Sequence, residues 1–240
     1  MKAVVSRGIV GAGLLGLLAL PVAAQDLTIV SVVKGGPQPM TQTQYLTADQ
    51  ARTSTGDTDV IVQYGPGRII TIDNKKKEYS EATFDEMAAT LRKLDEQMAK
   101  MPAFLQKSMG GGVKPVTVQK GTATRQIAGY DCTQYTLSQG EDMVFEIWAA
   151  PTIQAPTKLV ESMKAQWAAM GPMGRRFAAM YDEMAKIKGY PLSFGMGYKL
   201  AGKKIDSVIE ATEVKKGPIP PSVFAIPAGY KQKPAPFAQK

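Results

Sequence analysis

The chain alternates apolar and polar residues in short runs, interrupted by two longer stretches with helical spacing. The clearest run is Met143–Ala149, where Met143, Phe145 and Ile147 alternate with Val144, Glu146 and Trp148. A period of two predicts a strand with one buried face. With Asp131–Ser138 before it and the turn residues 139–142 between, this stretch predicts a β-hairpin at the centre of the fold.

Further β-forming runs, separated by Gly, Pro and Asn, predict a meander of short antiparallel strands. They lie at residues 27–34, 41–47, 51–55, 60–64, 68–72, 76–80, 113–119, 122–127, 192–200 and 205–215.

Two helical regions are predicted from apolar residues at steps of three and four. The first begins at Thr83, which forms a capping box with Glu86. The second runs from about residue 157 to 188 and is broken at Gly171-Pro172. The two apolar stripes contain Met87, Leu91, Leu94, Met98, Met101 and Leu105, then Met173, Phe177, Met180, Met184 and Ile187.

These elements predict an α+β domain. Two amphipathic helical regions must bury their apolar stripes, and the concave face of a curved sheet is the natural place. We therefore expect a strongly curved antiparallel sheet, a half-barrel, covered by the two helical regions.

Five pieces of sequence occur in an order that resembles a known exported bacterial family. They are the strand pair with Tyr45 and Arg52, IITIDNKKKEYSEAT (69–83), IAGYDCTQY (127–135) with EIWAA (146–150), GYPL (189–192) and VFAIPAGY (223–230). The family is a domain of unknown function grouped with the LolA/LolB lipoprotein-carrier fold, and the resemblance runs from about Thr41 to Tyr230. It implies a LolA-like half-barrel that binds acyl chains between sheet and lid.

The first 24 residues are typical of an export signal. Lys2 and Arg7 are followed by the apolar run Gly8–Leu20 and by small residues up to Ala24. We expect a signal peptide over 1–24, a single domain over 25–230 and a disordered tail over 231–240. No cysteine follows Ala24, so we expect a periplasmic protein without a lipid anchor or a remaining transmembrane segment.

The charge and the residue types exclude several function classes. The net charge is +8, or +6 without Lys2 and Arg7 (27 − 21), but the lysines are scattered, so nucleic acid is not an expected partner. The chain has no histidine, which removes the Ser-His-Asp and Cys-His units and ordinary zinc sites. We expect no enzyme, no metal and no cofactor, and a buried, inert Cys132.

Nine of the 13 methionines fall in the two helical regions. Methionine adapts to irregular space. The pattern is compatible with ordinary core packing, with a lid over an apolar ligand, or with a copper(I)-binding thioether cluster. These methionines are Met87, Met98, Met101, Met109, Met163, Met170, Met173, Met180 and Met184.

A ligand cavity, if the lid interpretation holds, would lie between the central hairpin, a neighbouring strand and the helix faces. Arg52, beside Tyr45, is the candidate for holding a ligand's head group. The predicted lining residues are Leu94, Met98, Phe145, Ile147, Phe177, Met180, Phe194 and Met196.

Two functions from different classes follow. The first is a periplasmic, non-enzymatic protein that holds a lipid-like or other hydrophobic ligand between sheet and lid. The second is an envelope protein-interaction or structural module with a filled core and no small ligand.

We predict that the precursor is cleaved between Ala24 and Gln25, because small residues precede that bond directly after the apolar run. N-terminal sequencing of protein from the envelope fraction would begin at Gln25. An intact Met1 would contradict the assignment of an export signal.

Overall fold

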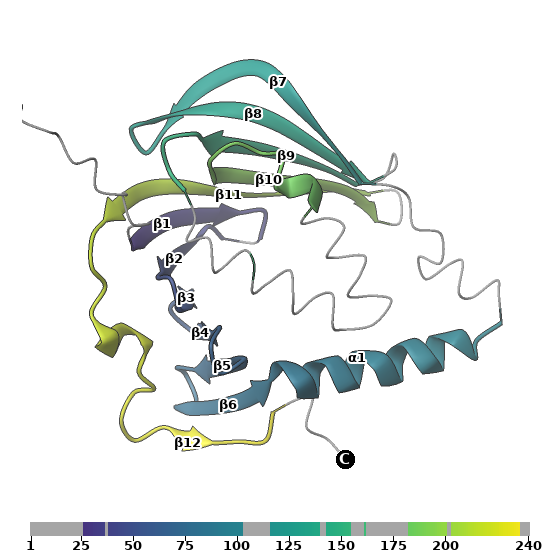
Figure 1. Ribbon diagram of the computed structural model, residues 1–240, viewed down its shortest axis with the longest axis vertical. Helices are drawn as coiled ribbons and strands as arrows, with labels where there is room; N and C mark the ends of the chain where they lie inside the picture. The colour runs from purple at the N-terminus through teal and green to yellow at the C-terminus, as the bar shows by residue number, and fades with distance from the viewer. Residues whose placement is uncertain are drawn as a thin grey trace, which may run out of the picture.

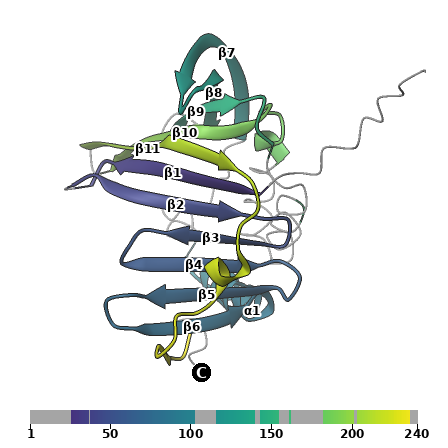
Figure 2. The ribbon, with the colours of Figure 1, turned by 90° about the vertical axis from the view of Figure 1, so that its left-hand side faces the viewer.

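The computed structural model describes residues 26–36, 38–102, 116–139, 143–154, 161, 182–200 and 203–235. Within these ranges the chain forms one twelve-stranded sheet (Figures 1 and 2). The strands are β1 (Leu27–Lys34), β2 (Met40–Leu46), β3 (Gln50–Ser54), β4 (Thr58–Gln63), β5 (Arg68–Asp73), β6 (Glu78–Thr83), β7 (Val116–Ile127), β8 (Tyr130–Gln139), β9 (Met143–Ala150), β10 (Tyr190–Leu200), β11 (Lys203–Lys216) and β12 (Lys231–Gln232).

The strand order is β12-β6-β5-β4-β3-β2-β1-β11-β10-β9-β8-β7. All neighbours are antiparallel except β12, which pairs with β6 in parallel. The first strand lies in the middle, between β2 and β11. The sheet is thus two meanders, β2–β6 and β7–β11, joined through β1 (Figure 2). The predicted central hairpin is confirmed as β8–β9.

The helix α1 (Phe84–Ala99) begins at the residue that follows β6. The predicted capping box is confirmed: the Glu86 amide donates to Thr83 Oγ1 at 3.1 Å, and the Thr83 amide donates to Glu86 Oε2 at 2.8 Å. The 3₁₀ helix η1 (Pro221–Phe224) lies between β11 and β12. In the described part of the chain, no helix has both the length and the apolar character that a membrane crossing requires.

The predicted half-barrel covered by two amphipathic helical regions is wrong. The sheet is open, with β12 and β7 at its ends. The helix α1 continues directly from β6 without a loop, so the direction of β6 carries it away from the sheet instead of back across it (Figure 1). Of the second predicted helical region, residue 161 and residues 182–184 are described and are helical; most of residues 157–188 lie outside the described ranges.

The sheet buries its apolar residues largely by curling on itself. The strands β7 and β11 approach each other although three strands lie between them in the sheet order. A register shift between Lys120 and Thr124 bends β7, which forms one strand where the sequence predicts two. Residues 231–235, expected in a disordered tail, instead lie against β6, where Lys231 and Gln232 form β12.

Three groups of buried residues form the core. One lies where the two meanders meet and includes Leu27, Ile29 and Trp148. A second lies on β8–β10, and a third lies between β4–β5 and the segment around η1. Cys132 belongs to the first group and is 1% exposed, as predicted.

Gly189 gives a test of the close approach between β9 and β10. Its φ of +96° is left-handed, and a β-carbon there would overlap the backbone of Ala150 and Pro151. We predict that Gly189→Ala lowers the free energy of unfolding by more than about 3 kcal/mol, because backbone atoms must move. Urea denaturation would measure the loss.

Gly56→Ala is the matched control. Gly56 also has a positive φ, +83°, but nothing lies within 4 Å of a β-carbon at that position. Only the backbone strain remains, and it should cost about 1–2 kcal/mol. Equal losses in the two variants would show that the close approach is not what requires glycine at position 189.

Candidate functional site

Four of the predicted lining residues do come together. Phe145 and Ile147 on β9 pack with Phe194 and Met196 on β10, all in the core group of β8–β10. Phe194 faces Ile147 across the strand pair, and Met196 faces Phe145. The rings of Phe145 and Phe194 lie 5.3 Å apart, a distance typical of aromatic packing.

The central hairpin's share of this cluster is deeply buried. Phe145 is 7% exposed and Ile147 is 0% exposed, and Tyr135 and Leu137 on β8 pack beside them. Ile187 packs against the same group, and the Lys188 amide donates to the hydroxyl of Tyr135 at 3.3 Å. Phe194 and Met196 are only half-buried. These contacts are those of a packed core. On β10, at the edge of this core, part of the apolar surface stays exposed.

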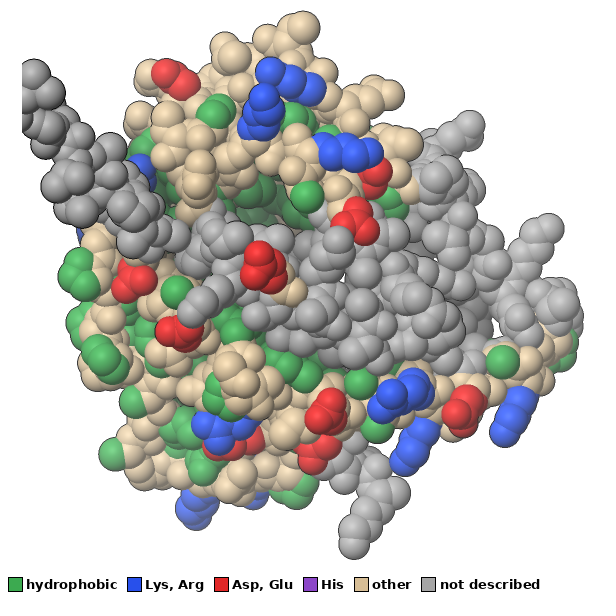
Figure 3. All heavy atoms as spheres, in the orientation of Figure 1, with side chains coloured by type: hydrophobic (Ala, Val, Ile, Leu, Met, Phe, Trp, Pro, Cys, Tyr) green, Lys and Arg blue, Asp and Glu red, His purple; other side chains and the backbone are tan. Residues whose placement is uncertain are grey.

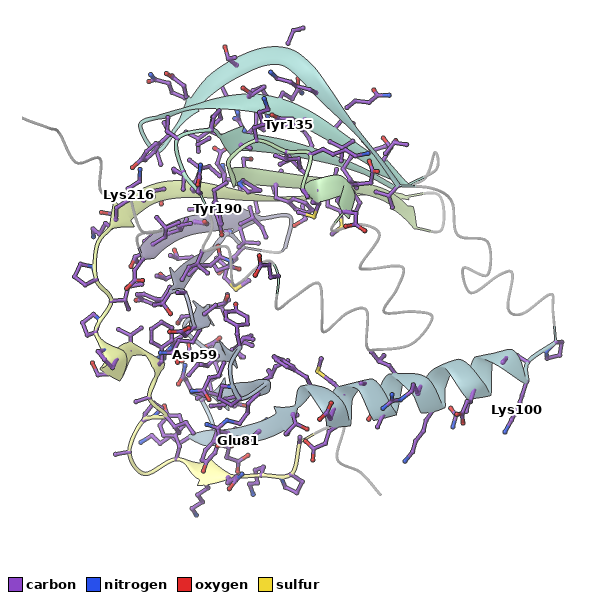
Figure 4. All side chains as sticks on the ribbon, in the orientation of Figure 1. Asp59, Glu81, Lys100, Tyr135, Tyr190 and Lys216 are labelled. Atoms are coloured by element: carbon purple, nitrogen blue, oxygen red, sulfur yellow. The ribbon has the colours of Figure 1, made fainter. Side chains whose placement is uncertain are left out.

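Tyr45 and Arg52 lie elsewhere. They face each other across β2 and β3, as predicted, but Tyr45 packs against the core group of β4–β5 and η1, and Arg52 donates to the carbonyl oxygen of Val223 beside that group. Figure 4 shows Asp59, the partner of Arg52, in the β3–β6 half of the sheet and Tyr135 in the β7–β10 half. The candidate head-group residue and the candidate lining residues are therefore in separate parts of the molecule.

Arg52 is held by an internal network. One terminal nitrogen, Nη2, lies 2.6 Å from Asp59 Oδ2, and the other, Nη1, donates to the carbonyl oxygen of Val223. Asn74 donates to the same Asp59 oxygen at 3.0 Å. Asp59 is 1% exposed and Arg52 is 17% exposed, so the ion pair is largely removed from water.

The network keeps Asp59 ionised. Burial is the largest single influence on this carboxyl, and it favours the neutral acid. Hydrogen bonds with Ser54 and Asn74, together with the hydrogen bond and the positive charge of Arg52, outweigh burial. The pKa of Asp59 is therefore lowered from its usual value.

Residues 217–235, which we call the C-terminal strap, cross the outer face of β3–β6, on the side away from α1 (Figures 1 and 2). Phe224 of the strap is 6% exposed and packs with Ile61, Ile70 and Ile72. The hydroxyl of Tyr230 donates to Asn74 Oδ1 at 3.0 Å. The strap thus covers the outer face of β3–β6, which is not the concave face that the sequence analysis assigns to the helices.

Sequence reasoning missed a second cluster, which links β7 to β11. The guanidinium of Arg125 lies 4.5 Å from the ring centre of Trp148. It also donates to Ser193 Oγ at 3.2 Å and to Glu210 Oε2 at 2.7 Å. No motif marks these four residues, because they come from four strands and meet only when the sheet curls.

The remaining predicted residues lie outside what the structure describes. This holds for Phe177 and Met180, for the side chains of Leu94 and Met98, and for Ala24 and Gln25. The ligand cavity that combines them with β9 and β10 stays a prediction.

The described residues give little support to chemistry at a reactive group. They contain no cluster of three or more His, Cys, Asp or Glu side chains that could hold a metal ion. Burial raises the pKa of the Cys132 thiol, which disfavours the reactive thiolate. Burial also raises the pKa of Tyr190 to about 12, and its hydroxyl donates to Gln44 at 3.4 Å.

The charged side chains on the face shown in Figure 3 are spread out. In the view of Figure 3, acidic and basic side chains alternate along α1 and over β3–β6 instead of gathering in one patch. Several pair locally, such as Lys75 with Asp57 at 2.6 Å and Lys76 with Asp73 at 3.1 Å. The positively charged turn 75–77 is thereby partly neutralised.

Comparison with protein families shows to which family the chain belongs. The model of the family described as "Domain of unknown function (DUF4412)" matches residues 41–230, and the chain belongs to this family. No curated protein matches the chain.

Several solved structures match part of this chain's backbone fold. An uncharacterised conserved protein from Thermus thermophilus is 7% identical, with a TM-score of 0.49 and coverage of 88% of this chain and 91% of that one. MucB in the MucA/MucB complex of Pseudomonas aeruginosa is 11% identical, with a TM-score of 0.42 and coverage of 86% and 56%. PNGF-II is 12% identical, with a TM-score of 0.41. The match with PNGF-II covers 88% of this chain but only 31% of PNGF-II. These values are too low to establish a common function.

The Arg52–Asp59 pair generates a prediction about stability. We expect Arg52→Ala to lower the free energy of unfolding by about 3–5 kcal/mol, because it leaves a buried carboxylate without its cation. Arg68→Ala is the control, because Arg68 pairs with Glu81 at 3.1 Å at a more exposed site, where the two side chains are 40% and 24% exposed, and its loss should cost about 1 kcal/mol. Urea denaturation at neutral pH would compare the two.

The pH dependence should differ as well. Since the folded pKa of Asp59 is lowered, its contribution is complete above the unfolded pKa, about 3.9, and is lost as pH falls toward the folded value. Without Arg52 that pKa rises toward or above the unfolded value, so Asp59 no longer makes the variant lose stability on acidification, and the difference in stability between wild type and variant should narrow as pH falls from about 5 to about 3. Parallel stability curves for the two proteins between pH 3 and pH 7 would contradict this role for Arg52.

Proposed function

We propose that this member of the family is an exported, periplasmic, non-enzymatic interaction module of the cell envelope, which binds a partner protein through its surface. Its core is filled, and it does not carry a lipid-like ligand between sheet and helices. The export signal predicted over residues 1–24 supports the location.

The observation that carries the proposal is the packing of the predicted lining residues. Phe145 and Ile147 are almost completely buried, and the Phe145 ring packs on Phe194. Residues that line an open cavity would keep part of their surface for the ligand. On β9 that surface is already in contact with the protein itself.

The position of Arg52 supports the same proposal. A head-group anchor needs free donors that point toward the ligand. Both terminal nitrogens of Arg52 already bond to the protein, one to Asp59 and one to Val223. The network also lies apart from the apolar cluster of β8–β10, so one amphiphilic ligand would not contact both as the sequence suggests.

The absence of histidine and the structural use of the buried charges argue against catalysis. Asp59 is ionised by an ion pair and hydrogen bonds, and burial keeps the thiol of Cys132 protonated. Neither group combines reactivity with exposure, which a nucleophile or a general base requires.

The lipid-carrier function remains the second candidate, because Phe194 and Met196 are half-buried at the margin of the apolar cluster. An acyl chain there would gain about 0.8 kcal/mol for each buried methylene group. Such a site would have to be completed by the other residues that the sequence predicts to line it, Leu94, Met98, Phe177 and Met180.

We predict that the purified mature protein shows no saturable binding of a fluorescent fatty-acid probe, and that native mass spectrometry gives the mass of the polypeptide alone. The reason is that the β9 side of the apolar cluster has no free surface. Phe194→Ala serves as the comparison, because Phe194 is half-buried and the most accessible aromatic residue of the cluster. Saturable binding by the wild type that weakens at least tenfold in Phe194→Ala would establish the carrier function instead.

A further inference from the structure

The C-terminal strap lies on the sheet as an extended peptide ligand lies on its receptor. Its aromatic anchor, Phe224, is buried among isoleucines, and its backbone carbonyl at Val223 accepts from Arg52. Beyond the anchor, β12 adds a strand to the edge of β6. Main-chain pairing at a sheet edge combined with a side-chain pocket is a recurrent mode of peptide recognition.

The surface under the strap is built by β3–β6 without help from the strap. We call it the strap-binding face, and it consists of Arg52, Ile61, Ile70, Ile72, Asn74 and the β6 edge at Glu78 and Tyr79. Asp59 orients Arg52 and Asn74 from within the sheet. The guanidinium and the amide would therefore keep their positions if the strap left.

The strap itself is held unevenly. The anchor Phe224 is buried, but Lys231, Gln232 and Lys233 are exposed. Beyond Tyr230 the contacts include the pairing of β12 with β6, backbone hydrogen bonds from Lys231 to Lys77 and from Lys233 to Tyr79, a half-exposed ion pair between Lys233 and Glu78 at 3.3 Å, and one buried side chain, Ala235. Exposed contacts of this kind open locally far more readily than the core of a sheet.

We propose that the strap-binding face is the docking surface for an extended segment of a partner protein, and that the strap is its intramolecular competitor. This inference rests on the proposed function and names the kind of partner. The strap shows what the segment must provide: a bulky aromatic anchor, a free backbone carbonyl beside it, and a basic residue about nine positions further on, as Lys233 follows Phe224. The face selects a polypeptide over a lipid, because the contact of Arg52 with a carbonyl oxygen and the strand pairing at β6 both use backbone groups.

A labelled synthetic peptide with the sequence of residues 217–235 is the probe. It should bind the mature Lys233→Pro variant at least fivefold more tightly than the wild type in fluorescence anisotropy. Proline removes the amide that donates to Tyr79 at 2.7 Å and also the ion pair with Glu78, so the internal competitor weakens while the face is unchanged. Lys233→Ala, which keeps the amide, is the matched control and should show a smaller gain.

The peptide carries the second control. A peptide with the Phe224→Ala change should bind at least tenfold more weakly, because the anchor is lost while the protein is untouched. Absence of saturable binding to a cooperatively folded Lys233→Pro protein would overturn the proposal, and so would binding that ignores the aromatic anchor.

Hydrogen exchange on the unmodified wild type tests release of the strap directly. The amides of Lys231 and Lys233 should exchange at least tenfold faster than the paired amides of β4 and β5. Equal protection would mean that the strap leaves only when the whole domain unfolds, and the proposal would fail. Fatty-acid binding by the wild type would overturn the proposed function, whereas these results bear only on the docking surface.

Discussion

The pairing of β1 on both sides is the constraint on which the whole sheet depends. Residues 27–34 pair with β2 next to them in sequence and with β11 some 180 residues later. Without this strand, β2–β6 and β7–β11 would be two separate meanders, each with an exposed edge at the break. A long loop must close before these contacts form, so the fold requires nearly the full chain.

An open sheet leaves two outer edges, and the molecule treats them differently. At β6 the strap adds β12 and covers the neighbouring face. At β7 a register shift, the exposed Lys120 and the approach to β11 disrupt regular pairing. A bulge and a lysine are devices that discourage a further strand, whereas β12 occupies its edge in the way that a further strand would. The β6 edge is thus the one adapted to pairing.

Much of the local structure could be predicted from local signals. The alternation around Phe145 predicts β9, and Thr83 with Glu86 predicts the first turn of α1, because the residues that decide each feature are neighbours in sequence. The arrangement of layers could not be predicted this way. An apolar stripe shows that a helix must be buried, but not where, and the direction of α1 is set by its direct continuation from β6.

The candidate site shows the same limit for individual residues. The sequence indicates that Arg52 faces Tyr45 across two strands, and it does. It cannot indicate that Asp59, seven positions away, is brought to 2.6 Å by the next hairpin, nor that Val223 arrives from the other end of the chain. The alternation of apolar and polar residues can be recognised within a single strand. The segment that covers each face of the sheet depends on contacts between residues that are distant in sequence.

The two sets of candidate residues therefore have different physical roles. The aromatic pair Phe145 and Phe194 meets its requirement for burial within the protein, which leaves little apolar surface on β9 to attract a ligand. The ion pair of Arg52 and Asp59 does not by itself satisfy the hydrogen-bond donors of Arg52. Asp59 accepts from one terminal nitrogen, and a carbonyl oxygen of the strap accepts from the other. A largely buried charge that receives one of its hydrogen bonds from a separable segment links the stability of the sheet to the occupancy of one face. A segment that replaces the strap consequently has to offer that acceptor.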